Sequence, residues 1–111
     1  MDLLTLIKER HGDFVKLCSS HKVEKLYAFG SSITQHFDPA KSDIDLVVKV
    51  DIDNPIDRGE ALLSLWDSLE ALFGRKVDLL TEESIRNPYL KASINRTKKL
   101  IYDGEGEKVF V

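Results

Sequence analysis

Four short apolar runs alternate along this chain with segments of helical periodicity, and this alternation most constrains the fold. The runs are VEKLYAFG (23–30), IDLVVKV (44–50), RKVDLLT (75–81) and LIYD (100–103). Each is short and rich in leucine, β-branched or aromatic residues, which predicts strands. Because a helical segment precedes each run, the order predicts an α/β (α+β) fold in which helices cover a sheet of about four strands.

Apolar residues at intervals of three and four predict the helices between these runs. The first helix ends near Ser20, with Gly12 placed to bend or interrupt it, and its stripe contains Leu3, Leu4, Ile7, His11, Phe14, Val15 and Cys18. The loop DIDNPIDRG (51–59) feeds a helix that Gly74 closes, with a stripe of Ala61, Leu62, Leu65, Trp66, Leu69, Leu72 and Phe73. SSITQHF (31–37) and NPYLKASINRTKKL (87–100) predict two more helices, and Thr81 supplies capping chemistry for a helical turn between strand and helix.

Length and composition exclude several classes of protein. We expect a single domain over residues 1–111, without a membrane span, since the chain contains no apolar stretch of about 18 residues. The amphipathic N-terminus is not typical of a signal peptide. The single cysteine, Cys18, excludes an internal disulfide and is expected to be a buried, inert thiol, which indicates the cytoplasm. A net charge of −3 argues against broad electrostatic binding to nucleic acid.

Two aspartates, Asp43 and Asp45, open the second predicted strand. On an extended strand, residues two apart point to the same side, about 7 Å from each other along the chain. Two carboxylates this close repel each other unless a cation lies beside them, and hard oxygen ligands of this kind suit Mg²⁺. Taken alone, the pair is more often a set of turn or capping residues, so the motif needs further support.

Two further features support a catalytic interpretation. At Gly30-Ser31 the first strand stops at a small-residue turn, where backbone N–H groups can approach a phosphate. Asp78 interrupts the apolar run of the third strand, and a carboxylate there is costly unless it is paired or binds a metal. A phosphate cradle and three strand-borne acids together predict two-metal phosphoryl or nucleotidyl transfer. In haloacid-dehalogenase-like phosphatases and DxD glycosyltransferases the apolar run precedes the acids, whereas here it follows them, so those families fit poorly.

Phe29-Gly30-Ser31, Asp43-Ile44-Asp45-Leu46 and Val77-Asp78-Leu79 resemble the signature elements of the polymerase-β-like nucleotidyltransferase superfamily, with eleven residues between Ser31 and Asp43. The small size resembles the minimal nucleotidyltransferases (MNT) of that superfamily. The resemblance implies a mixed sheet of the polymerase-palm type, with helices mainly on one face. It also implies that Asp43, Asp45 and Asp78 bind two Mg²⁺ ions and that Gly30, Ser31 and Ser32 bind the triphosphate of ATP.

The same resemblance implies a partner. Many minimal members pair with a HEPN-domain toxin, and some transfer AMP from ATP to a tyrosine hydroxyl of it. Many also have Arg directly after Gly-Ser, where this chain has Ser32, so that neutralisation of the triphosphate falls on Lys41, Lys49 or no residue.

Three functions therefore remain open. The chain transfers AMP to its partner, or it neutralises a HEPN-like partner by binding alone. Transfer to a small molecule fits less well, because a pocket for one usually needs more surface than this domain offers. The apolar tail Val109–Val111 is consistent with a homodimer, with another protein contact and with a frayed end.

Overall fold

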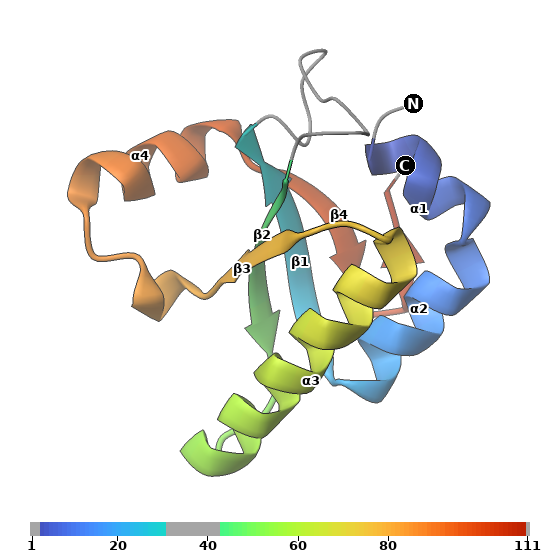
Figure 1. The fold of residues 1–111 in the computed structure, drawn as a ribbon. Coiled ribbons are helices and arrows are strands. Elements are labelled where there is room, and N and C mark those ends of the chain that lie inside the picture. Colours follow the sequence, from blue (N-terminus) through green and yellow to red (C-terminus); the bar gives the residue numbers. More distant parts are fainter. Residues whose placement is uncertain (1–2, 31–42, 111) are drawn as a thin grey trace.

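A five-stranded mixed sheet forms the centre of the computed structural model, which describes residues 3–30 and 43–110 (Figure 1). The elements in chain order are α1 (Leu3–Glu9), α2 (His11–Ser20), β1 (Val23–Phe29), β2 (Ile44–Val50), α3 (Pro55–Phe73), β3 (Val77–Leu80), the short 3₁₀ helix η2 (Glu82–Ser84), α4 (Pro88–Thr97), β4 (Lys99–Asp103) and β5 (Lys108–Val109). The helix predicted over 31–37 lies outside the described residues.

The strands are ordered β3-β2-β1-β4-β5 across the sheet. β2 and β3 are parallel, and the other three neighbouring pairs are antiparallel. The predicted mixed sheet is therefore confirmed. A parallel pair requires a crossover, and α3 provides it by running from the end of β2 back to the start of β3.

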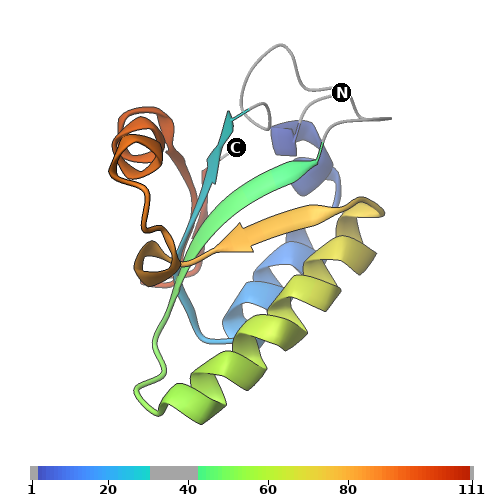
Figure 2. The ribbon, with the colours of Figure 1, turned by 60° about the vertical axis from the view of Figure 1, so that its left-hand side comes forward.

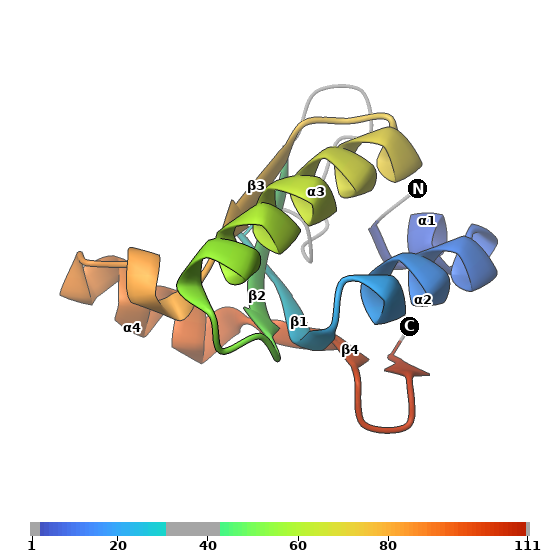
Figure 3. The same cartoon turned by 90° about the horizontal axis from the view of Figure 1, so that it is seen from below.

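The sheet has one strand more than the four predicted, because the polar segment GEGEK (104–108) after β4 turns the chain back onto β4. Gly106 has a φ of +80° and Glu107 a φ of +51°, and these conformations turn the chain so that Tyr102 pairs with Val109. The hydroxyl of Ser19 donates a hydrogen bond to Glu107 Oε1 at 2.7 Å. This bond attaches the turn to α2, beside which it lies in Figure 3.

The single N-terminal helix predicted from the sequence is two helices, and the break lies at Arg10 instead of Gly12. Arg10 has a φ of −116°, and its N–H donates to both Leu6 O and Ile7 O at 3.2 and 3.1 Å. Gly12 lies inside α2. The break allows each half to bury its own apolar residues, and His11, predicted on the stripe, is exposed.

The helices α3 and α4 begin in the same way, with an Asn cap followed by proline. Asn54 Oδ1 accepts hydrogen bonds from the N–H groups of Ile56 and Asp57. Asn87 Oδ1 accepts hydrogen bonds from the N–H groups of Tyr89 and Leu90 in the first turn of α4. Proline fits the first helical position because its missing N–H is not needed there. The predicted loop 51–59 is consequently shorter than expected, since α3 already starts at Pro55. Gly74 closes α3 in the left-handed conformation, as predicted.

The core lies between one face of the sheet and the helices α1 to α3, whereas α4 lies toward the opposite face (Figure 2). Alternate strand residues fill this core, among them Leu26, Ala28, Ile44, Leu46, Val48, Val77 and Ile101. Helices mainly on one face were predicted, and this is confirmed. Every helix in residues 3–30 and 43–110 is too short or too polar to cross a membrane.

Candidate active site

The three predicted acids lie at neighbouring positions of two parallel strands. Asp43 directly precedes β2, and Asp45 and Asp78 are the second residues of β2 and β3, where they pair in register. Ile44 and Val77 alternate with them and are fully buried in the core. Because strand side chains alternate between faces, the acids belong to the face that points away from α1 to α3.

Electrostatics show that the acids lie close together. The pKa of Asp45 is raised from 3.8 to about 6, first by burial of the carboxyl and then by the negative charges of Asp78 and Asp43. A side-chain hydrogen bond with Asp78 raises it further. Burial and two neighbouring negative charges thus make the ionised form of Asp45 unfavourable at this position.

Gly30 brings the end of β1 against the Asp45 carboxylate. Its neighbour Phe29 pairs with Asp45 in the sheet, and Gly30 has a φ of +64°. A Cβ atom at Gly30 would lie 2.8 Å from Asp45 Oδ2. The position thus favours glycine twice, through its backbone conformation and through the close approach. The structure brings Gly30 and the three acids together, while Ser31 and Ser32 lie outside the described residues.

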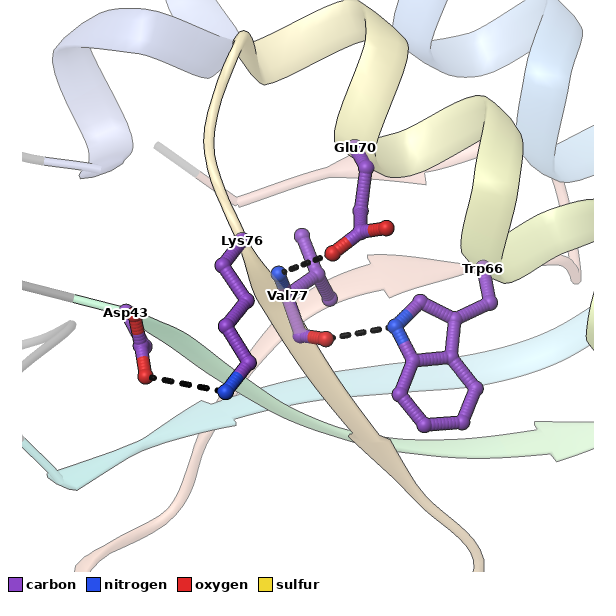
Figure 4. A network of polar contacts seen from close by, with 5 residues as sticks. All are labelled: Asp43, Trp66, Glu70, Lys76 and Val77. Atoms are coloured by element: carbon purple, nitrogen blue, oxygen red, sulfur yellow. Dashed lines mark hydrogen bonds and ion pairs between the residues drawn. The ribbon is translucent and has the colours of Figure 1, made fainter.

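A lysine that the sequence analysis did not single out joins this cluster. Lys76 Nζ lies 3.9 Å from Asp43 Oδ2 (Figure 4). Its signal in the sequence is its place two residues before Asp78, which puts both side chains on one face. Lys49, which was considered for the triphosphate, instead pairs with Glu24 at 3.6 Å. Lys41 lies outside the described residues.

Two side chains of α3 fix the start of β3. Trp66 Nε1 donates a hydrogen bond to Val77 O, and Val77 N donates to Glu70 Oε2 at 2.9 Å (Figure 4). Trp66 was predicted as plain core, so its polar role was missed. Trp66 and Glu70 are one helical turn apart, and together they hold both polar groups of Val77. The strand that carries Asp78 is thereby anchored to the longest helix.

The acids fit a hard divalent cation by their chemistry. In the described part of the chain, no group of three His, Cys, Asp or Glu side chains is arranged to hold a metal ion, and Asp43 is paired with Lys76. Mg²⁺ needs no such group, because it takes one or two protein carboxylates and completes its shell with water and phosphate oxygens. One or two of these carboxylates can supply such a partial set.

Comparisons with known proteins agree with this geometry. The family model described as polymerase beta, nucleotidyltransferase, matches residues 13–107. Two proteins of Methanocaldococcus jannaschii that bear the name protein adenylyltransferase are 39% and 38% identical over 105 residues. Each alignment covers 92% of this chain and 99% of the relative.

Solved structures share the fold. One described as a minimal nucleotidyltransferase is 28% identical with a TM-score of 0.59, and the match covers 89% of this chain and 95% of the other. Another, a toxin–antitoxin complex with AMP-PNP, contains a chain that is 26% identical with a TM-score of 0.56. That match covers 83% of this chain and 72% of the other.

Proposed function

This chain belongs to the polymerase beta nucleotidyltransferase family, and we propose that it transfers AMP from ATP to a hydroxyl group of a partner protein in a reaction that requires Mg²⁺. The observation that carries the proposal is the convergence of Asp43, Asp45 and Asp78 beside Gly30. Transfer of a nucleotidyl group needs charge stabilisation around the triphosphate and a group that takes the acceptor proton.

The three acids share two tasks in this proposal. Asp43 and Asp45 would hold the Mg²⁺ ions, which when bound would lower the negative charge on the α-phosphate and on the departing pyrophosphate. Asp78 completes the metal site and helps to take the proton from the acceptor hydroxyl. The raised pKa of Asp45, about 6, supports these roles, because closely spaced carboxyl groups are typical of sites that bind cations.

The turn after β1 holds the β- and γ-phosphates. Gly30 lets the backbone approach the phosphate oxygens because it has no side chain. We assign Ser31 and Ser32 to the same task, as donors of backbone and hydroxyl hydrogen bonds.

The relatives support the choice of donor and acceptor. The archaeal relatives bear the name protein adenylyltransferase, and one structural neighbour is a toxin–antitoxin complex with an ATP analogue. We therefore assign ATP as the donor and a HEPN-domain toxin as the partner, with the chain acting in the cytoplasm as its antitoxin.

Transfer of label from ATP tests this proposal. The protein is incubated with Mg²⁺, ATP labelled at the α-phosphate and a candidate HEPN-domain partner. We expect label on the partner with the wild-type chain and none with Asp43→Asn or Asp45→Asn. Asp53→Asn, an exposed aspartate between β2 and α3, should leave transfer unchanged. Absence of label on the partner with the wild-type chain would contradict the proposal.

A second candidate function is neutralisation of the toxin by binding alone. Ser32 stands where many minimal members have Arg, and Asp43 is paired with Lys76, which favour weak catalysis. Co-expression with the toxin separates the two functions. If a double variant of Asp43→Asn and Asp45→Asn still protects cells, binding is sufficient. If protection is lost while the complex still forms, transfer is required.

A further inference from the structure

The proposed site carries more negative charge than its recognised residues can balance. A nucleoside triphosphate would add its own negative charges to those of three carboxylates, and Ser32 supplies no cation after the Gly-Ser turn. Lys76 is a cation within the acid cluster, with its ammonium 3.9 Å from Asp43 Oδ2. Resting on the function proposed above, we propose that Lys76 binds the triphosphate of the nucleotide and that Asp43 holds its ammonium when the nucleotide is absent.

The backbone of Lys76 is held in place beside the acids. Ile44 N donates a hydrogen bond to Lys76 O at 3.0 Å, so Lys76 lies next to Asp43 just as Asp78 lies next to Asp45. The next residue, Val77, is fixed by α3 (Figure 4). Because Lys76 and Asp78 are two residues apart on an extended backbone, both side chains point to the face of the site.

The side chain of Lys76 is free to change its partner. Its side chain is 68% exposed, and that of Asp43 is 44% exposed. An ion pair this exposed contributes little to stability. Lysine carries its charge on a flexible four-carbon stem and binds phosphate as a point charge. The ammonium can therefore leave Asp43 for a phosphate oxygen at little cost.

The role proposed for Asp43 in binding a metal ion explains why Lys76 would leave Asp43 for a phosphate oxygen. If Asp43 held a divalent cation, that cation would repel the neighbouring ammonium of Lys76. The oxygens of a triphosphate would then offer the ammonium a partner of opposite charge. Lys76 thus supplies a positive charge beside the acids that Ser32 does not supply.

Binding of two nucleotides by matched lysine variants tests the inference. Lys16 is the control, because it is exposed on α2, which covers the face of the sheet opposite the acids. Calorimetry with Mg²⁺ measures the Kd for AMP-PNP and for AMP. We expect Lys76→Ala to weaken AMP-PNP binding about tenfold and AMP binding less than about twofold, whereas Lys16→Ala changes neither. Lys76→Arg should restore most of the affinity for AMP-PNP, because it restores the positive charge.

The outcomes separate this inference from the proposed function. The inference is wrong if Lys76→Ala binds AMP-PNP as tightly as the wild-type protein does. It is also wrong if the variant loses as much affinity for AMP as for AMP-PNP, even where transfer to the partner is intact. If Lys76→Ala shows the selective loss but the wild-type protein transfers no label, the inference stands and the proposed acceptor is wrong. A wild-type protein that does not bind AMP-PNP would overturn both.

Discussion

At the scale of single residues, Asp45 is the most constrained side chain of the site. It lies between Asp78 on the neighbouring strand and the Gly30 turn, and it senses the charge of Asp43. Its pKa of about 6 means that ionising this carboxyl costs more free energy in the folded protein than in the unfolded chain. An arrangement that costs stability without a ligand is typical of a functional site.

Asp45→Asn should therefore stabilise the protein when no metal is present. The folded-state pKa of about 6 exceeds the ordinary 3.8, so the free energy of unfolding falls as the pH rises from about 4 to about 6 and stays low above that range. A shift of two units corresponds to about 3 kcal/mol, and solvent screening of this half-buried group reduces the expected gain to about 1 kcal/mol. Urea unfolding with a chelator should show this gain at about pH 7.5 and none at about pH 4.

The control for this measurement is Asp53→Asn, which removes an exposed carboxylate outside the site. It should change the free energy of unfolding little at either pH. A loss of stability in Asp45→Asn at neutral pH would show that a bound cation or an unrecognised donor already compensates the charge.

Residue patterns predicted the acids but not Lys76. The alternation of apolar and polar residues along a strand predicts which side chains share one face of it. It does not state the register between two strands, and the pairing of Asp43 with Lys76 depends on the parallel register of β2 and β3. The sequence placed Gly30 and the acids in one site, but the close contact of Gly30 with Asp45 depends in the same way on the register of β1 and β2.

At the scale of elements, α3 positions the strand that carries the third acid. Its 19 residues present an apolar stripe to the core and, one turn apart, the polar groups of Trp66 and Glu70 to Val77. The stripe was predicted from the sequence, because periodicity identifies a buried face. The two hydrogen bonds were not, because they depend on where the crossover brings β3.

Glu70→Ala should weaken both the fold and the site. Val77 is fully buried, and loss of its acceptor leaves a buried N–H group unpaired, which costs about 1–3 kcal/mol. Urea unfolding measures this loss. Affinity for Mg²⁺ should also fall, because β3 carries Asp78.

Two variants of the same helix serve as controls for that experiment. Glu60→Ala changes an exposed glutamate of α3 and should alter stability by less than about 0.5 kcal/mol. Glu70→Gln keeps an oxygen acceptor and should recover most of the stability. Equal losses in the alanine variants of residues 60 and 70 would show that the bond to Val77 contributes nothing.

At the scale of the whole molecule, one core joins the helices α1 to α3 to the sheet, and Cys18 lies inside it. Phe14 packs between the rings of Phe73 and Tyr102 in this core, with ring centroids 6.2 and 6.1 Å away. The sequence predicted this core and the buried thiol because both follow from local patterns. The fifth strand was missed because it has only two residues, Lys108 and Val109, and the turn that pairs it with β4 is formed by polar residues and glycines.

Cys18 should react with iodoacetamide only when the whole protein unfolds. Its thiol is fully buried, so the reagent cannot reach it, and this burial raises its pKa from 9.0 to about 12. Little of the reactive thiolate is therefore present. Mass spectrometry at about pH 8 should show labelling at least about 1,000-fold slower in buffer than in concentrated urea. Rapid labelling in buffer would mean that the α2 region opens without global unfolding.

The hydrogen bonds from α3 to Val77 also limit how another chain can pair with β3, which is an edge strand of the sheet. A foreign strand that added to the sheet there would meet a residue, Val77, whose backbone N–H and C=O are both already hydrogen-bonded. It would first have to displace an indole and a carboxylate. Edge-to-edge pairing with another chain is thereby disfavoured at Val77, next to the strand position that carries Asp78.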